Sequence, residues 1–200
     1  MTTRSGWAAR VPTSLLWIVV IAFAVRFGYI LVAFLAGRNI AVEAVAFYLV
    51  AYTVTTLGAF GIVTVLSNPE RDADALEDYR GLFWRRPVMA GAFTAMLLSL
   101  AGIPATVGFL AKFYVLAAGT SAAIVPLLIV LVVTSAIGLF YYLRIIVALY
   151  SEAPRHAAQL PTVYPSGGFI LAVLTILLIW FGVYPAPLLN LIRNTMRGLL

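Results

Sequence analysis

The feature that most constrains the fold of this chain is its series of long apolar runs. Five such runs occur, at about residues 14–37, 41–66, 88–116, 123–149 and 168–184. A helix of about 20 apolar residues is long enough to cross the hydrocarbon core of a bilayer. Hydrophobic residues make up 64% of the chain and charged residues only 10%, whereas a soluble domain carries about a quarter charged residues. The sequence therefore predicts an all-α integral membrane protein with about five transmembrane helices.

The third run contains the stretch GIPATVGFLAKFYVL, which does not suit one continuous helix. Gly102, Pro104 and Gly108 all fall within it. A proline lacks an amide proton and clashes with the carbonyl four residues earlier. Backbone groups left unpaired by a break are tolerated at membrane depth only against protein or water. We therefore predict a broken third helix, which serves either as a packing kink or as part of an ion site.

Lys112, the only lysine in the chain, lies eight residues beyond Pro104. If a second half-helix begins near the proline, burial and the positive end of that helix both disfavour a charged ammonium. A lysine placed in this way can alternate between charged and neutral forms, as a proton relay requires and as arginine cannot. The alternative is a lysine whose ammonium simply extends to the interface, and the residues alone leave both readings open.

Four further polar residues within the apolar runs are weaker candidates for a proton pathway: Arg26, Thr53, Thr56 and Arg144. Arg26 interrupts the first run near its midpoint, where a charge is costly unless it faces a cavity or a carboxylate. Thr53 and Thr56 share one helical face, although such hydroxyls more often pack helices together. Arg144 lies close to a helix end, and we expect it to extend toward the interface.

The distribution of arginines predicts the orientation in the membrane. Eight arginines lie on the side of the N-terminus and of the second and fourth loops: Arg4, Arg10, Arg71, Arg80, Arg85, Arg86, Arg144 and Arg155. Only Arg38, Arg193 and Arg197 lie on the opposite side. Because basic loops remain in the cytoplasm, we expect a cytoplasmic N-terminus and an outer C-terminus in a bacterial inner membrane.

Both ends of the chain carry further patterns. The stretch after Pro187, with Arg193 and Arg197 on one helical face, predicts an amphipathic helix at the interface. The basic start, the apolar stretch after it and the A-x-A-like end also fit a signal peptide formed by residues 1–24 and removed by cleavage. The apolar run resumes after Arg26, however, which favours a membrane span.

Composition also bears on catalytic and metal sites. The chain has no cysteine and only one histidine, His156, which leaves no thiolate chemistry and no metal site rich in histidine. The carboxylates of the 69–86 loop lack a recognised metal-binding spacing and predict a solvated face. A net charge of +6 would suggest nucleic-acid binding in a soluble protein, but no basic stripe with interleaved aromatic residues occurs. We therefore expect no metal site and no nucleic-acid partner.

Four stretches resemble the antiporter-like membrane subunits of proton-pumping NADH:quinone oxidoreductase, respiratory complex I. They are FYLVAYTVTTLGAFGIV, YRGLFWRRP, LSLAGIPATVGFLAKFYVL and SAIGLFYYLRIIVALY, in that order. The ending AKFYVL is similar to subunit N in particular, while subunits L and M and the cation/proton antiporter subunits share the Gly-Ile-Pro break. The resemblance covers about residues 27–200 and leaves residues 1–26 as a divergent segment, in which Arg26 stands where histidine is common.

The resemblance implies a fold of fourteen helices with two inverted repeats, of which this chain contains only the last five helices. It places Lys112 on the proton-relay lysine of the second repeat. It also implies that NADH, flavin, iron–sulfur centres and quinone bind other subunits, so we expect no cofactor in this chain, and that its partners are the lipid bilayer and the other membrane subunits of complex I.

The expected function is therefore that of a proton-translocating subunit of NADH:quinone oxidoreductase, without redox chemistry of its own. The alternatives are a cation/proton antiporter subunit of related fold and a vestigial, truncated membrane protein. Whether the chain is a fragment, a frameshift product or a native short protein stays open.

Overall fold

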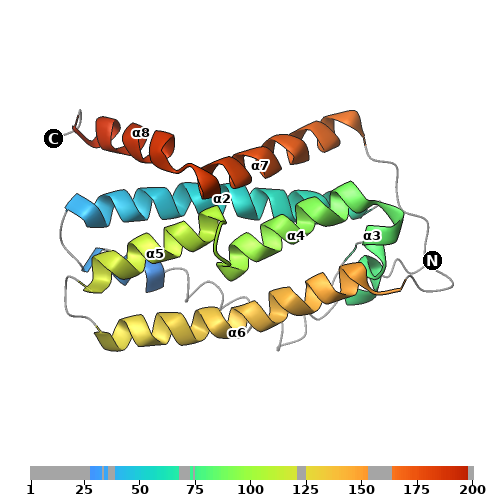
Figure 1. Ribbon diagram of the computed structural model, residues 1–200, viewed down its shortest axis with the longest axis horizontal. Coiled ribbons are helices and arrows are strands. Elements are labelled where there is room, and N and C mark those ends of the chain that lie inside the picture. Colours follow the sequence, from blue (N-terminus) through green and yellow to red (C-terminus); the bar gives the residue numbers. More distant parts are fainter. Residues whose placement is uncertain are drawn as a thin grey trace, which may run out of the picture.

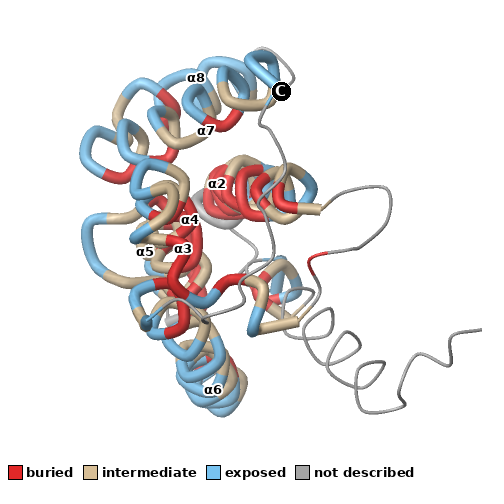
Figure 2. Tube along the Cα trace, turned by 90° about the vertical axis from the view of Figure 1, so that its right-hand side faces the viewer, coloured by how far each residue is buried: buried red, intermediate tan, exposed pale blue. Residues whose placement is uncertain are grey.

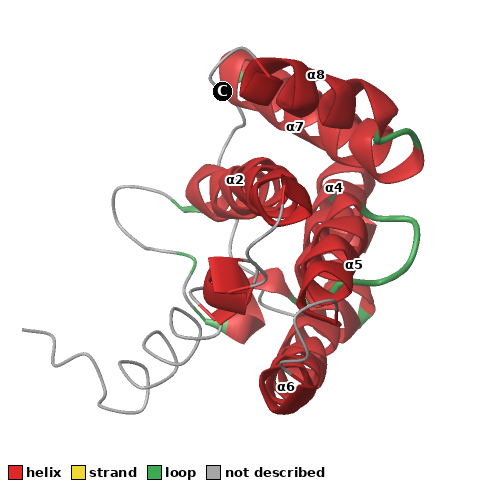
Figure 3. Cartoon of the chain, turned by 90° about the vertical axis from the view of Figure 1, so that its left-hand side faces the viewer, coloured by secondary structure: helices red, strands yellow, loops and turns green. Residues whose placement is uncertain are grey.

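The computed structural model describes residues 28–32, 34–35, 39–67, 73, 75–120, 125–152 and 164–197. All regular secondary structure in these ranges is helical (Figure 3). Residues 28–32 and 34–35 are helical, and the elements that follow are α2 (Asn39–Leu66), the 3₁₀-helix η1 (Leu76–Tyr79), α3 (Leu82–Arg85), α4 (Pro87–Ala101), α5 (Val107–Thr120), α6 (Val125–Tyr150), α7 (Pro165–Val183) and α8 (Ala186–Arg197). Most of the first predicted helix, together with Arg26 and residues 1–24, lies outside the described residues.

Three of the described helices contain apolar segments long enough to cross a membrane. These segments are Val42–Leu66 in α2, Val125–Tyr150 in α6 and Pro165–Val183 in α7. The third predicted helix is present as two shorter pieces, α4 and α5, which follow one another alongside α2 (Figure 1). The prediction of an all-α membrane fold with a broken third helix is therefore confirmed.

The helices form a bundle in which α4 and α5 lie between α2 and α6 (Figure 1). The chain runs in one direction along α2 and α6 and in the opposite direction along α4–α5 and α7. Helix α2 packs against α4, α5 and α7, and more of it is buried than of α6, which is largely exposed (Figure 2). The exposed residues of α6 include Ile129, Val133, Ile137 and Val147, and apolar side chains on an exposed helix surface suit contact with lipid.

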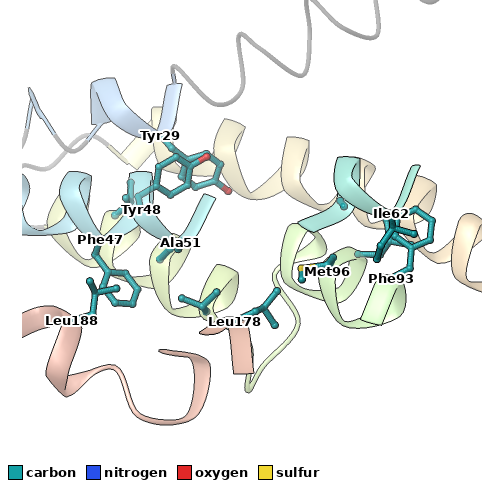
Figure 4. Close-up of a cluster of buried hydrophobic side chains, with 14 of the residues drawn as sticks. Tyr29, Phe47, Tyr48, Ala51, Ile62, Phe93, Met96, Leu178 and Leu188 are labelled. Carbon is teal, nitrogen blue, oxygen red and sulfur yellow. The ribbon is translucent and has the colours of Figure 1, made fainter. Parts of the chain in front are cut away.

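The core of the bundle is built mainly from side chains that α2 presents to its neighbours. Phe47 and Ile62 are fully buried, as are Met96 of α4 and Leu178 of α7. Figure 4 shows these side chains in a cluster that also includes Leu188 of α8. This packing fixes both halves of the broken helix against one continuous helix.

The segment between α2 and α4 is folded against the end of α6. The Gly81 amide donates a hydrogen bond of 3.1 Å to the Ala148 carbonyl, and the buried Tyr79 ring packs against Phe93, with 5.5 Å between ring centroids. Asp78 accepts a hydrogen bond of 3.1 Å from the Ala75 amide. These contacts hold the arginine-rich loop at one end of the bundle.

Helix α8 is amphipathic, as the sequence predicts. Leu188 and Leu189 are buried against the bundle, whereas Arg193 and Arg197 are exposed. The helix follows Pro185 directly and continues beyond the end of α7 (Figure 1). Buried leucines on one side and exposed arginines on the other are typical of a helix that lies at a membrane interface.

Candidate functional site

The break between α4 and α5 is a helix cap followed by a tight turn. Gly102 adopts a φ of 81°, and its amide donates to the Leu98 and Ser99 carbonyls, each at 3.0 Å. The Ile103 amide also donates to the Leu98 carbonyl at 3.0 Å. This is a Schellman cap, in which a left-handed residue, usually glycine, ends the helix. The carbonyls of Leu100 and Ala101 come after those that the cap uses, at the open end of α4.

Pro104 lies in the turn and not inside a helix. The Thr106 amide donates to the Ile103 carbonyl at 3.3 Å, and Ala105 has a φ of 70°. Proline as the second residue and a positive φ at the third are typical of a type II turn. Gly102 and Ala105 therefore turn the chain, and Pro104 fits the turn without being the cause of the break.

Lys112 extends from α5 back into the break. Helical side chains tilt toward the N-terminus of their helix, and α5 begins five residues before Lys112. The Nζ atom donates to the Leu100 carbonyl at 2.9 Å, the Ala101 carbonyl at 3.1 Å and the Ser135 hydroxyl at 2.9 Å. Three acceptors match the three protons of an ammonium group.

The electrostatic setting of Lys112 differs from the one expected from the sequence. The sequence places the lysine near the positive end of α5, which disfavours an ammonium. Its nitrogen, however, contacts the carbonyls at the end of α4, where the helix dipole is negative and favours a cation. The carbonyls that accept from the amine belong to the last residues of α4, at the break between α4 and α5, which lies part-way along the bundle (Figure 1).

Two buried hydroxyl groups join the break to α2. The Gly108 amide donates to Ser99 Oγ at 3.1 Å, and Ser99 Oγ lies 3.2 Å from Thr55 Oγ1. Thr55 in turn donates to the Ala51 carbonyl at 2.7 Å. A Cβ atom at Gly108 would lie 2.0 Å from the Ser99 carbonyl oxygen, so only glycine allows α5 to approach α4 this closely.

A cavity of about 380 Å³ lies beside Lys112. Its wall combines apolar residues with hydroxyl groups from α2, α4, α6 and the helical segment at residues 28–32. The polar residues of the wall are Tyr29, Tyr48, Tyr52, Thr55, Ser99, Lys112, Thr134, Ser135, Tyr141 and Tyr142. Tyr29 stacks on Tyr48 with 5.5 Å between ring centroids, and its hydroxyl donates to the Leu131 carbonyl at 3.3 Å. Lys112 is the only cationic side chain among the residues that line this cavity.

Of the four residues predicted at the break, Gly102 lies against the Lys112 side chain and Gly108 lies against Ser99, whereas Pro104 is exposed in the turn. The weaker candidates do not line the cavity. Thr53 is exposed on the outer face of α2, and Thr56 is partly buried, while Arg144 is exposed on α6. Arg26 lies outside the described residues.

The sequence interpretation missed three hydroxyl residues: Thr55, Ser99 and Ser135. Thr55 lies between the two threonines that were considered, but on the buried face of α2, and Ser99 lies one turn before the capping Gly102. Ser135 has no local signal because its contact with Lys112 joins two helices. Among the described residues, no group of three or more His, Cys, Asp or Glu side chains could hold a metal ion.

A bundle of apolar helices, with a polar site where one helix is broken, defines a class of membrane proteins typical of ion and substrate transport. Residues 20–138 match the model of the family described as NADH:quinone oxidoreductase/Mrp antiporter, transmembrane, and the chain belongs to this family.

Within that family, the chain resembles subunit N. It is 52% identical over 174 residues to NADH-quinone oxidoreductase subunit N of Ectopseudomonas mendocina (strain ymp), an alignment that covers 84% of this chain and 35% of that protein. A chain in the structure of respiratory complex I from Thermus thermophilus with bound aureothin has a similar fold, with a TM-score of 0.69 and 29% identity over 81% of this chain and 36% of that chain. This chain thus spans about a third of the length of the relatives it matches.

Proposed function

We propose that this chain is part of a proton-translocating membrane subunit of NADH:quinone oxidoreductase, with Lys112 as a proton-relay group. The observation that carries the proposal is the position of the Lys112 ammonium, which lies between two half-helices within hydrogen-bond distance of two backbone carbonyls and one hydroxyl. The 52% identity to a subunit N supports the same function. Because the chain spans 35% of that relative, we propose that it acts as part of a longer subunit.

The Leu100, Ala101 and Ser135 groups that accept from Lys112 have different chemical roles in this proposal. The carbonyls of Leu100 and Ala101 accept hydrogen bonds but have no proton to give, so they hold the ammonium in place. The Ser135 hydroxyl can both accept and donate. Once Lys112 is neutral, its lone pair can accept a hydrogen bond from Ser135, so the proton path runs between Lys112, Ser135 and the hydroxyl-lined cavity.

The subunit contributes no redox step. In this proposal, electron transfer takes place elsewhere in the complex, and its energy reaches Lys112 as a change in the electrostatic field or in the access of water. The other membrane subunits of the complex and the surrounding lipid are the proposed partners.

We also propose the orientation of the chain in a bacterial inner membrane. The loop that contains η1 and α3 carries Arg80, Arg85 and Arg86 at one end of the bundle, while α8 lies toward the other end (Figure 1). Because basic loops are retained in the cytoplasm, the η1–α3 end faces the cytoplasm and α8 faces the outer side.

A second candidate function, as a cation/proton antiporter subunit, is favoured only by the breadth of the family, whose description names both kinds of protein. Copurification separates the two candidates. A tagged chain that brings down subunits of complex I supports the proposed function, whereas association with antiporter subunits supports the alternative.

The relay is tested with Lys112→Met and Lys112→Arg in proteoliposomes that carry the fully assembled complex. We expect proton uptake per NADH oxidised to fall sharply in both variants, because methionine removes the titrating amine and arginine stays charged at all relevant pH. Arg144→Gln is the control, since Arg144 is exposed on α6 and does not line the cavity. Normal proton uptake by Lys112→Arg, at equal assembly, would overturn the relay assignment.

A further inference from the structure

Ser99 and Thr55 form a directional chain of hydrogen bonds across the break. Thr55 has a single hydroxyl proton, and its shorter contact is with the Ala51 carbonyl, at 2.7 Å against 3.2 Å to Ser99. The proton between the two hydroxyls therefore belongs to Ser99, which donates to Thr55 and accepts from the Gly108 amide. This series of hydrogen bonds runs from the first turn of α5, through the last turn of α4, to α2.

Both hydroxyls are almost completely removed from solvent, since the exposed fraction is 1% for Ser99 and 2% for Thr55. The Gly108 amide is one of the first amides of α5, which have no carbonyl partner in their own helix. A buried amide without a partner is costly, and more so in the low dielectric of a membrane protein. The Ser99 hydroxyl therefore does more than fill space, because it satisfies an amide that the break leaves open.

The same hydrogen bond sets the position of Lys112. Gly108 precedes Lys112 by one helical turn, and Ser99 precedes Leu100 by one residue. The contact between Ser99 and Gly108 therefore fixes the distance between the Lys112 nitrogen and the Leu100 carbonyl, which is 2.9 Å. The turn itself is held by the hydrogen bonds that the Thr106 amide and hydroxyl donate to the Ile103 carbonyl, at 3.3 and 2.7 Å. Both half-helices also pack on α2, and the Ser99–Gly108 hydrogen bond acts together with this packing.

We infer that Ser99 and Thr55 are positioning residues of the proposed relay: their hydroxyls hold α5 against α4 so that the Lys112 ammonium meets the Leu100 and Ala101 carbonyls. The inference rests on the proposed function for its biological meaning. The position of the Lys112 ammonium can nevertheless be tested without measuring proton transport. The inference assigns a role to two hydroxyls that do not contact the lysine themselves.

Lys112 provides a direct readout, because it is the only lysine in the chain. A small, membrane-permeant amine acylating reagent is applied to the assembled complex, and the modified Lys112 peptide is quantified by mass spectrometry. An amine held as an ammonium by two carbonyls reacts slowly, since only the free, neutral amine is nucleophilic. Release of the amine therefore raises the rate of acylation whether or not proton uptake changes.

The variants are Ser99→Ala, Thr55→Val and Thr55→Ser, with Thr53→Val as the matched control. Ser99→Ala leaves the partly buried Gly108 amide unpaired, and we expect acylation of Lys112 to become about 5-fold faster or more. Thr55→Val should have a smaller effect in the same direction, and Thr55→Ser, which keeps the hydroxyl, should restore the slow rate. Thr53→Val makes the same change on the exposed face of the same helix and should leave the rate unchanged.

The outcomes separate this inference from the proposed function. Equal acylation rates in Ser99→Ala and the unmodified sequence would overturn the inference. If Ser99→Ala fails to fold, equal acylation rates in Thr55→Val and Thr55→Ser would overturn it instead. Normal proton uptake by Lys112→Met would overturn the proposed function and leave the acylation result unaffected. Proton uptake that is reduced by Ser99→Ala and retained by Thr53→Val would support both the inference and the proposed function.

Discussion

The nitrogen of Lys112 in α5 lies 2.9 Å from the carbonyl oxygen of Leu100 in α4, so a side chain of one half-helix is bound to the backbone end of the other. This contact exists because the Schellman cap at Gly102 uses the Leu98 and Ser99 carbonyls and leaves the later ones at the open end of α4. A single cation thus stabilises the negative end of α4 inside a membrane bundle. The break and the lysine form one structural unit.

The close approach of α5 to α4 predicts that Gly108→Ala destabilises the fold. The new Cβ would lie 2.0 Å from the Ser99 carbonyl oxygen, and because backbone cannot move aside easily, we expect a loss of about 1–3 kcal/mol in the free energy of unfolding. Gly91→Ala is the matched control within α4, since nothing lies within 4 Å of its Cβ position. That variant should gain up to about 1 kcal/mol from helix propensity. Thermal unfolding in detergent, followed by near-UV circular dichroism, compares the two.

Pro104→Ala should leave the break intact. A proline that interrupted a continuous helix would, on removal, allow the helix to straighten, but here the turn is set by the positive φ of Gly102 and Ala105. We expect a cost of about 0.4–1 kcal/mol from the less restricted unfolded chain, and proton uptake by the complex close to normal. Loss of proton uptake together with faster acylation of Lys112 would show that the proline itself maintains the break.

Glu43 and Arg193 join the start of α2 to α8. Arg193 Nε donates to Glu43 Oε2 at 3.0 Å, and Arg193 Nη2 lies 2.7 Å from Glu43 Oε1. We expect Glu43→Gln to speed amide hydrogen exchange in α8. Added salt should reduce the difference in exchange rate between Glu43→Gln and the unmodified sequence, because half of the Arg193 side chain is exposed and salt screens the ion pair. Arg197→Gln is the control, since Arg197 has no ion pair within the described residues. Equal exchange in Glu43→Gln and the unmodified sequence would show that the pair does not hold α8.

Arg193 should stay protonated, so its part in the Glu43–Arg193 ion pair should not respond to pH. The hydrogen bond to Glu43 and the negative charge of its carboxylate raise the pKa of Arg193 above its usual value. A raised pKa gives stability that is complete below the unfolded pKa and is lost only as the pH rises through the folded pKa. Exchange in α8 should therefore show no transition due to Arg193 between about pH 5 and pH 9.

The proposed orientation is tested with single cysteines, because the chain contains none of its own. Glu77→Cys places a thiol on η1 at the arginine-rich end, and Asn194→Cys places one on the exposed side of α8. A membrane-impermeant maleimide should label Asn194→Cys in intact spheroplasts and Glu77→Cys only in inverted vesicles. The opposite pattern would reverse the orientation.

The sequence by itself determined the class of fold, because the cost of placing polar backbone and charge in lipid leaves long apolar runs few structures other than helices. It also located the break, since glycine and proline have local conformational effects, and it singled out Lys112 because a lone lysine in an apolar run is costly. The bounds of α2, α6 and α7 follow from the same local rules.

Only the tertiary structure decided which groups Lys112 meets. The Ser135 hydroxyl comes from another helix, the buried face of α2 selects Thr55 and not Thr53 or Thr56, and the Leu100 and Ala101 carbonyls are available only because the cap leaves them open. The physical reason is that hydrogen bonds and burial depend on which helix faces pack together, and periodicity in one apolar segment does not record the rotation of its neighbours. For the same reason, the sequence predicted that Lys112 lies in the positive field at the start of α5. Packing instead brought its ammonium to the negative, C-terminal end of α4.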